Sequence, residues 1–417
     1  MRILFVHQYF PGQFSRIVKH YLQDGEHDIV AFHRGLNDGR SSQMIDGVRA
    51  FTYGGEIVSD RPSDHVLLGT DVFVREAASM AIQAQGLKDA GWVPDLIYSH
   101  TGWGTGAFLQ DIFPSSRFIK YCEWFYNNTT DSTEFLESNR PFESRIMTSL
   151  LNIPVLADLA RADLLISPTE WQRSQFPGHT RASIEVVPDG IDTDLFKPDS
   201  TVEINLANGK IVRAGDRIIT YVARGADPFR GFEQFIAALE IVQEKDPLVE
   251  AIVVGDRNVY YGPGHGTDAH FRNVMAQSGV DLSRTHFTGA LPYETYRKVL
   301  QVSAAHVYLT VPFVLSWSAL EALSTGCGFV GSDTAPIREF VESGQNGLLA
   351  NFFDPRAIAD KIEIMLAGGP MIDGLKERAR KTIVSRWSAE SAIRKHMALV
   401  GKLLPGMVEE TKLCASN

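Results

Sequence analysis

The sequence predicts an α/β protein made of two doubly wound, Rossmann-like domains of similar size, each with a parallel sheet. Two observations predict this class. Apolar runs of strand length recur along the chain, and many of them end in Gly, Pro, Asp, Ser or Thr. Segments with apolar residues at helical spacing separate the runs. Continuous apolarity over about five residues is typical of parallel strands that are buried on both faces.

In the first half, the apolar run at residues 2–7 is followed by Gly12 and then by apolar residues at helical spacing between 14 and 22. The chain is therefore expected to begin with a strand, a glycine turn and a helix. The strands expected in this half span residues 2–7, 28–32, 95–98, 117–121, 163–167 and 183–187.

The second half repeats the scheme, with helical stripes at 232–239 and around 320–323. Its expected strands span residues 217–223, 251–255, 286–291, 305–309, 328–332 and 347–352.

We predict a first domain over 1–200, a second over 201–384, and a C-terminal helix within 385–417 that crosses back to the first domain. The connection near 190–215 is polar and rich in turn residues, and NGKIVRAGD (208–216) indicates a small hairpin. In such architectures ligands bind beyond the carboxyl ends of the strands, so we expect the site in a cleft between the domains.

Composition excludes several classes of protein. The 417 residues suggest two or three domains at roughly 100–200 residues each. Three scattered cysteines, without CxxC spacing, predict neither a disulfide framework nor a zinc site and favour a reducing compartment. No stretch approaches the roughly 18–20 apolar residues of a membrane span, and the N-terminal run is too short for a signal peptide. We therefore expect a cytoplasmic protein, with contact at the inner face of the membrane left open.

The net charge of −10 lies mostly in residues 1–200, which hold 17 basic and 26 acidic side chains. This acidic half argues against nucleic acid as a partner.

Two arginines flank a strand-to-helix loop in the segment RIITYVARGADPFRGFEQF (217–235). Arg224 follows the expected strand, and Arg230 precedes the next helix. Guanidinium groups beside a helix N-terminus suit a diphosphate, because fixed donors and the helix dipole act together. The alternative is a pair of surface arginines that form ion pairs with Asp227 and Glu233.

Glu321 lies in the first turn of a helix expected to start near Ser316 or Ser318. It can accept hydrogen bonds from ribose hydroxyls. The alternative is a capping box, in which Glu321 bonds the amide of Ser318, and spacing alone favours this alternative.

Several segments together resemble the family 4 glycosyltransferases, which have the GT-B fold. VVPDGIDTDLFKP (186–198) is similar to the family's NGxDxxxF segment, and YVARGADPFRGFEQFIAAL (221–239) resembles its nucleotide-sugar segment. LEALSTGCGFVGSDTAPIREFVESGQNGLL (320–349) resembles a third family stretch. The N-terminal FVHQYFPGQF and SHTGWGTGAF are similar to one subgroup. The matches run along nearly the whole chain, in the family's order.

The resemblance implies transfer of a sugar, with retention of configuration, from a nucleoside diphosphate donor to an acceptor hydroxyl. It implies that Arg224 and Arg230 bind phosphate, with Arg in place of the usual Lys at position 230, and that Glu321 holds the ribose. It implies no metal and no cofactor beyond the donor, a UDP- or GDP-sugar being favoured. The acceptor stays open among saccharides, lipid-linked saccharides, proteins and small molecules.

Phe313 departs from the family pattern, because the first glutamate of the family's Glu-x7-Glu motif falls on it. The turn that follows still offers backbone amides at Val314, Leu315 and Ser316 to a sugar, and the Ser316 hydroxyl adds a further donor.

The first half offers three further site candidates. Gly12, at the first strand-to-helix turn, allows close approach of a ligand to the backbone, or serves only as a turn residue. The resemblance implies that His100 approaches the donor sugar, and the alternative is a core or capping role. Glu123 ends an expected strand, where its carboxylate orients an acceptor hydroxyl or acts as a base, or else caps a loop. Aromatic residues for a sugar-stacking groove, or for the core, are Trp103, Trp124, Phe125 and Tyr126.

Two motifs are interpreted as structural. Asp192-Thr193-Asp194 matches a DxD metal motif, but it falls in the connecting segment and is expected to form a turn. The glycine-rich segment 260–266 matches no dinucleotide or phosphate-loop motif, and we expect a surface loop there rather than a mobile loop over the donor.

The sequence leaves two alternative functions open. One is a nucleotide-sugar epimerase of similar fold, which needs no acceptor. The other is an inactive partner subunit that lost activity at Phe313.

Overall fold

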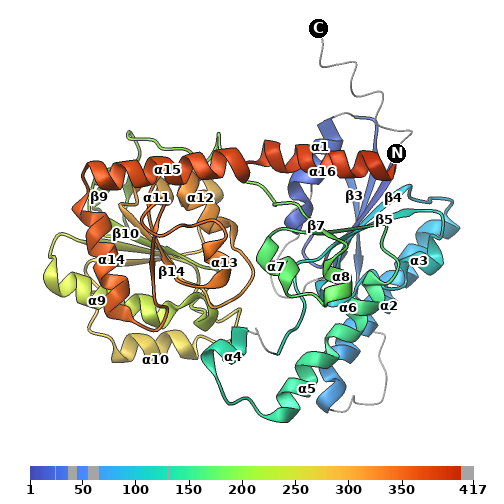
Figure 1. Cartoon of the computed structure of the whole chain (residues 1–417), viewed down its shortest axis with the longest axis horizontal. Coiled ribbons are helices and arrows are strands. Elements are labelled where there is room, and N and C mark those ends of the chain that lie inside the picture. The colour runs from blue at the N-terminus through green and yellow to red at the C-terminus, as the bar shows by residue number, and fades with distance from the viewer. Residues whose placement is uncertain (24, 36–44, 55–64, 129–131, 405–417) are drawn as a thin grey trace, which may run out of the picture. The chain divides into compact units, whose positions relative to one another are not determined.

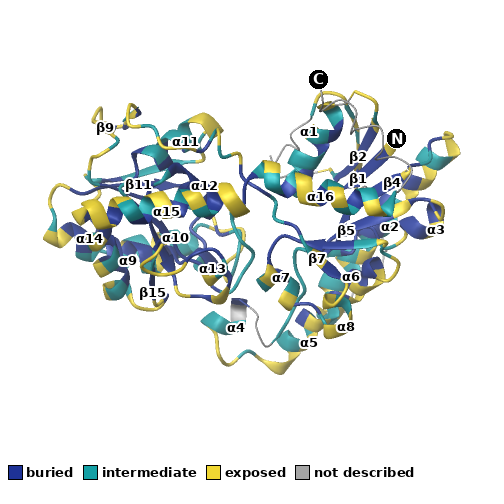
Figure 2. Ribbon diagram, turned by 45° about the horizontal axis from the view of Figure 1, so that its top comes forward, coloured by how far each residue is buried: buried dark blue, intermediate teal, exposed yellow. Residues whose placement is uncertain are grey.

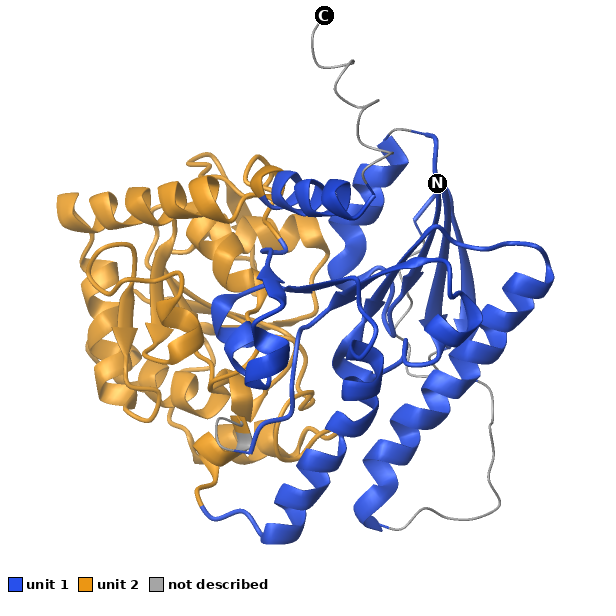
Figure 3. Cartoon of the chain, turned by 45° about the vertical axis from the view of Figure 1, so that its right-hand side comes forward, with its two compact units in different colours: residues 1–130, 139–189, 392–417 blue, residues 131–138, 190–391 orange. Residues whose placement is uncertain are grey.

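The computed structural model describes residues 1–23, 25–35, 45–54, 65–128 and 132–404. The chain divides into two compact units (Figure 1; Figure 3). The first unit comprises Met1–Thr130, Asn139–Asp189 and Ala392–Asn417. The second comprises Asp131–Ser138 and Gly190–Ser391.

The first unit contains a parallel seven-stranded sheet in the order β3-β2-β1-β4-β5-β6-β7. All six strands expected in this half are present, with small shifts at their ends. The strands are β1 (Arg2–Val6), β2 (Asp28–Arg34), β3 (Val48–Tyr53), β4 (Leu96–His100), β5 (Arg117–Tyr121), β6 (Leu164–Ser167) and β7 (Ile184–Val186).

The edge strand β3 is the one that the sequence analysis missed. Its first five residues are exposed or half-buried, because one side of an edge strand has no neighbour. The segment VRAFTY therefore lacks the continuous apolar run that marks the inner strands.

Both faces of this sheet are buried. Ile3 and Phe5 of β1 belong to one apolar cluster, whereas Leu4 and Val6 belong to another, since successive side chains of a strand point to opposite faces. Figure 2 shows these inner strands as buried. The helices of the unit are α1 (Ser15–Gln23), α2 (Leu68–Asp89), α3 (Leu109–Ile112), α5 (Phe142–Leu150), α6 (Asn152–Leu159), α7 (Glu170–Ser174), α8 (Gly178–Arg181) and most of α16 (Ala389–Leu403).

The second unit contains a parallel six-stranded sheet in the order β12-β11-β10-β13-β14-β15. All six strands expected here are present. They are β10 (Ile218–Val222), β11 (Glu250–Val254), β12 (Thr285–Gly289), β13 (Ala305–Tyr308), β14 (Gly328–Ser332) and β15 (Leu348–Ala350). The expected hairpin is present as β8 (Glu203–Asn205) with β9 (Ile211–Arg213), so its first strand lies earlier than predicted.

Helices cover both faces of this sheet. Side chains of α9 and α14 join one apolar cluster, and those of α11, α12 and α15 join another. The helices of the unit are α4 (Ser132–Leu136), α9 (Phe232–Lys245), α10 (Ala269–Gln277), α11 (Tyr293–Val302), α12 (Trp317–Thr325), α13 (Ala335–Arg338), α14 (Pro355–Ala367) and α15 (Pro370–Arg386). None of the helices in the described ranges is long and apolar enough to span a membrane.

Helix α4 belongs to the second unit although both segments that flank it in sequence belong to the first. The Ser132 hydroxyl donates to the Pro312 carbonyl at 2.8 Å, and the ring of Phe135 stacks on Phe353. Nothing in the local sequence pattern predicts this excursion, because it depends on contacts with residues far along the chain.

Helix α16 packs on the first unit. Val400 joins the same apolar cluster as Ile3, and His396 stacks on Tyr98, whose hydroxyl lies 2.9 Å from the His396 Nε2. Residues 405–417 of the predicted C-terminal segment lie outside the described residues.

His396 gives the first unit a pH-dependent stability. Burial, the main cause, and His20 lower the pKa of His396 from 6.5 to about 4. Below pH 6.5 the unfolded chain therefore binds a proton at His396 that the folded chain refuses until about pH 4, and stability is lost as the pH falls through this window. We expect this residue to contribute on the order of 3 kcal/mol to that loss. Denaturant unfolding from pH 7 to pH 4 checks this, and His396→Phe should flatten the dependence. An equal slope in both proteins would contradict it.

Candidate functional site

Arg230 is a buried cation with fixed geometry at the carboxyl end of β10. It ends the short helix η4 (Pro228–Arg230) and is 7% exposed. Its guanidinium donates to the Tyr308 hydroxyl at 2.8 Å, to Thr310 Oγ1 at 2.9 Å and to the Val314 carbonyl at 3.0 Å. A guanidinium has five N–H donors, so two remain beyond these three bonds.

Arg224 is the second, exposed arginine of this loop. Its guanidinium lies over the Tyr260 ring, 5.2 Å from the ring centre, and one of its nitrogens lies 3.4 Å from the Tyr261 hydroxyl. Within the described part of the chain, no carboxylate forms an ion pair with Arg224 or Arg230. The ion pairs with Asp227 and Glu233 that the alternative requires are therefore not formed among the described residues, although Arg224 does lie at the surface.

The loop that bears the arginines is held by the glycine-rich segment. Asp227 accepts hydrogen bonds on Oδ1 from the amides of Tyr260 and Tyr261, at 2.5 and 2.9 Å. Burial raises the pKa of the Asp227 carboxyl against the effect of these bonds. A Cβ on Gly225 would lie 2.0 Å from the Asn258 carbonyl oxygen, so the two segments are in close backbone contact. The segment expected to be a plain surface loop is thus part of the arginine site.

Phe313 packs among aromatic side chains of this site. Its ring centre lies 5.4 Å from that of Phe229 and 5.2 Å from that of Tyr261, and the Arg230 guanidinium lies over the Phe313 ring.

The turn after Phe313 supplies only part of the expected donors. The Ser316 amide donates to the Tyr308 hydroxyl at 3.1 Å, and the Ser316 hydroxyl forms a hydrogen bond with the Ser318 hydroxyl. The backbone amides of Val314 and Leu315 donate no hydrogen bond to any of the described residues. These two amides therefore have donor capacity that no described residue uses.

Glu321 does not form the capping box that spacing alone favoured. Helix α12 begins at Trp317 with Ser316 as its N-cap, so Glu321 is beyond the first turn. Its buried carboxylate, 3% exposed, accepts from the hydroxyls of Tyr293 at 2.6 Å and Tyr296 at 2.5 Å. Burial and the Glu321 charge raise the pKa of the Tyr296 hydroxyl, which keeps it protonated as a donor.

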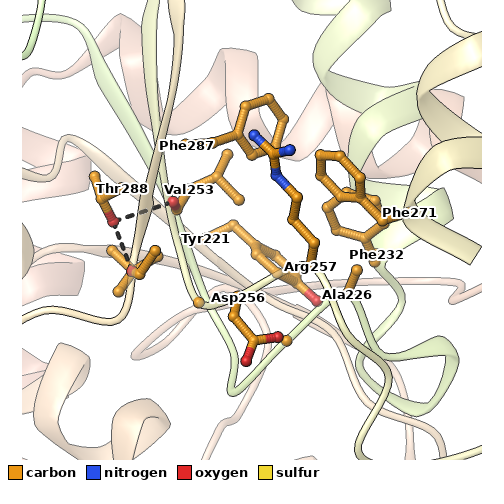
Figure 4. A pocket seen from close by; sticks show the side chains of 13 residues that line it. Tyr221, Ala226, Phe232, Val253, Asp256, Arg257, Phe271, Phe287 and Thr288 are labelled. Carbon is orange, nitrogen blue, oxygen red and sulfur yellow. Dashed lines mark hydrogen bonds between the residues drawn. The ribbon is translucent and has the colours of Figure 1, made fainter. Parts of the chain in front are cut away.

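A cavity of about 280 Å³ opens at the carboxyl ends of β10, β11 and β12 (Figure 4). Its walls include the rings of Phe232, Phe271 and Phe287, and the Arg257 guanidinium lies over Phe271. This cavity could not be predicted from local sequence patterns, because its rings come from three separate segments.

In the first unit, four polar side chains form a continuous chain of hydrogen bonds at the carboxyl ends of β1, β4 and β5. The His7 Nε2 lies 2.7 Å from the Gln13 Oε1, and the Gln13 amide nitrogen donates to Glu123 Oε1 at 2.5 Å. The His100 Nε2 lies 3.1 Å from the other oxygen of Glu123.

Backbone amides fix the direction of this chain. Tyr9 donates its amide to the Nδ1 of His7, and Gly102 donates to the Nδ1 of His100. Each histidine therefore carries its proton on Nε2 and donates there. Burial, followed by His100, lowers the pKa of His7 well below its usual value, so His7 is neutral. Gln13 and His100 therefore both donate to the Glu123 carboxylate, which is the final acceptor of the chain. His100 and Glu123 were predicted from the sequence, whereas His7 and Gln13, which flank the turn in HQYFPGQF, were not.

The space beside the Gly12 backbone is filled by a side chain of this network and is not open to solvent or ligand. It has a positive φ of 47°, and an added Cβ would lie 2.4 Å from the His7 ring. The side chain that approaches its backbone is thus His7.

The aromatic candidates of this unit divide between the site and the core. Trp103 stacks on His100 with ring centres 4.5 Å apart, and the Tyr126 hydroxyl donates to the Gly102 carbonyl. Phe125 packs against a buried apolar cluster, and Trp124 contacts Trp171.

Asp192 of the DxD motif forms the expected turn. Its carboxylate accepts from the amides of Asp194 and Leu195.

Comparison with known proteins now identifies the family. Residues 26–196 match the family described as Glycosyl transferase family 4 group, and residues 216–368 match Glycosyl transferases group 1. The chain belongs to the family 4 glycosyltransferases. The resemblance stated from the motifs is thereby confirmed.

Curated relatives are distant. A D-inositol 3-phosphate glycosyltransferase of Corynebacterium efficiens is 27% identical over 213 residues, which is 49% of this chain and 48% of that protein. A 2-deoxystreptamine N-acetyl-D-glucosaminyltransferase of Streptomyces fradiae is 25% identical over 300 residues, 70% of this chain and 66% of that protein. The chain thus spans about half the length of the first of these relatives.

Solved structures confirm the GT-B fold. Sucrose-phosphate synthase from Thermosynechococcus elongatus has a TM-score of 0.72 at 15% identity, covering 97% of this chain and 99% of that one. Anabaena Alr3699/HepE in complex with UDP and glucose has a TM-score of 0.64 at 15% identity, covering 96% and 100%.

The contact between Gly12 and His7 gives a stability prediction. Gly12→Ala should destabilise the first unit by about 1–3 kcal/mol, because the new Cβ meets the His7 ring at a positive φ. Denaturant unfolding measures this. The matched control is Gly86→Ala within α2, where a Cβ has open space, and it should stabilise by about 0.5–1 kcal/mol. Equal effects of the two substitutions would refute this account of Gly12.

Proposed function

We propose that the protein transfers a hexosyl group, with retention of configuration, from a nucleoside diphosphate sugar to an acceptor hydroxyl. The observation that carries the proposal is the buried Arg230, which is held by three hydrogen bonds, is not ion-paired within the described residues and has two N–H donors left. A fixed cation of this kind stabilises the charge that develops on a leaving diphosphate without having to reorganise.

Arg224 adds a second guanidinium for the same diphosphate, at the exposed side of the loop. The amides of Val314 and Leu315 add neutral donors. Two arginines and two amides supply the electrostatic stabilisation that a divalent cation gives elsewhere, so we propose that transfer needs no metal.

Glu321 is proposed to bind the ribose. Its two oxygens already accept one hydrogen bond each from tyrosine hydroxyls, and each carboxylate oxygen can accept more than one. The tyrosines thereby hold the carboxylate in a fixed orientation.

Glu123 is proposed to orient the acceptor hydroxyl. The relay from His7 and Gln13, together with His100, holds the carboxylate by donors alone, so it is the site's acceptor of further hydrogen bonds. In transfer with retention the acceptor attacks from the face that the diphosphate leaves. The phosphate oxygen can then take the acceptor proton as the new C1–O bond forms, and no separate base is needed.

We propose UDP or GDP as the nucleotide, since structural neighbours are described as complexes with UDP and with UDP-glucose. The acceptor is proposed to be a saccharide or a hydroxylated small molecule in a biosynthetic pathway, in the cytoplasm. An epimerase of the same fold stays the second candidate, and it differs in needing no acceptor.

Isothermal calorimetry with UDP, GDP, ADP and TDP, each with and without magnesium, tests the donor site. We expect micromolar, metal-independent binding of one nucleotide. Arg224→Ala should weaken it at least tenfold, since a charge-assisted hydrogen bond contributes about 1.5–3 kcal/mol. The matched control is Arg213→Ala on β9, which removes an exposed arginine of the same unit and should leave the affinity unchanged. If no nucleotide binds, or both variants weaken it equally, the diphosphate assignment is wrong.

A further inference from the structure

Three aromatic rings form a wall beside Arg230. They come from Phe229 on η4, Tyr261 in the loop after β11, and Phe313 in the turn after β13. Phe313 contacts both other rings, at interplanar angles of 70° with Phe229 and 59° with Tyr261. We call this group the aromatic wall.

The wall borders the cation that is proposed to hold the diphosphate. The Arg230 carbon Cζ lies 5.3 Å from the centre of the Phe313 ring. In a nucleoside diphosphate sugar, one bridging oxygen joins the outer phosphate to C1 of the sugar. A phosphate bound to Arg230 therefore brings either the sugar or the nucleoside against the wall.

The geometry favours the sugar. The Arg230 guanidinium lies over the Phe313 ring, and the two other rings meet it at steep angles, so the wall is not a flat platform for parallel stacking of a base. The amides of Val314 and Leu315 follow Phe313 directly, and they offer donors suited to sugar oxygens. A ring beside free amides suits a sugar edge that presents both C–H groups and oxygens.

The Phe313 ring cannot replace the water that a facing hydroxyl loses. Phenylalanine rings neither donate nor accept a normal hydrogen bond, so a hydroxyl against Phe313 would be desolvated without a partner, which is unfavourable. A methyl or methylene group in the same place instead buries apolar surface.

We propose that Phe313 is a specificity-determining residue and that the donor is a nucleoside diphosphate deoxyhexose whose deoxygenated carbon faces the Phe313 ring. This rests on the proposed function, because it takes Arg230 as the phosphate site. Phe313 selects the sugar, and the arginines bind the diphosphate that every such donor shares.

Calorimetry with donors that differ by one hydroxyl tests the selection. UDP-glucose is compared with its 3-, 4- and 6-deoxy analogues, and GDP-mannose with the corresponding deoxy analogues. In the wild type we expect at least one deoxy donor to bind about ten- to hundredfold more tightly than its parent, the upper figure being the effect that one hydroxyl has in an apolar pocket. The nucleoside diphosphate alone serves as the reference ligand.

Three variants separate selection from packing and charge. Phe313→Leu keeps the apolar surface and should keep the preference for the deoxy donor. Phe313→Glu offers a carboxylate to the hydroxyl and should reverse the preference. Any general effect of the new charge on diphosphate binding is the same for both donors of a pair, so it cancels in the ratio of their affinities. Arg213→Ala on β9 lies outside the wall and the arginine loop, so it should leave the ratio unchanged.

The outcomes distinguish the two proposals. A parent hexose that binds as tightly as every deoxy analogue, or a ratio that Phe313→Glu does not move, would overturn the selection while nucleotide binding stands. A loss of affinity for the nucleoside diphosphate itself in Phe313→Leu would place the nucleoside at the wall and also overturn it. Absence of binding by any nucleotide would overturn the proposed function, and the selection with it.

Discussion

The hydrogen bonds of the Arg230 guanidinium are the constraint on which the second unit's site depends. They tie the end of η4 to the last residue of β13, to Thr310 and to the turn at Val314. The Tyr221 hydroxyl on β10 donates back to the Arg230 carbonyl at 2.9 Å. Because these bonds link two neighbouring strand ends, the sheet itself fixes the cation. A buried charge held in this way is preorganised to meet an anion.

In the first unit, hydrogen bonds fix a carboxylate in place of a guanidinium. Its carboxylate, Glu123, is the final acceptor of a chain of neutral donors that begins at the amide of Tyr9. Gly12 is required in this chain because only a residue without a Cβ fits against the His7 ring. One unit thus presents a fixed cation and the other a fixed anion, each at the carboxyl ends of its parallel strands.

The sequence predicted the two parallel sheets and the place of Arg224 and Arg230, because continuous apolar runs and residues next to a strand end are local signals. It did not predict the edge strand β3, whose residues are largely exposed. The contact of Tyr261 with Phe313 was also missed, since it joins segments after different strands. The capping box at Glu321 was wrong because local spacing cannot reveal tyrosine hydroxyls on another helix.

Proton NMR of donor hydrolysis, without acceptor, tests the central claim most directly. Water then takes the place of the acceptor, and the anomer that forms first reports the face of attack before mutarotation mixes the products. For an α-linked nucleoside diphosphate sugar, the account predicts that the α-anomer appears first. First appearance of the β-anomer would contradict transfer with retention, and release of an epimerised nucleotide sugar would identify an epimerase instead.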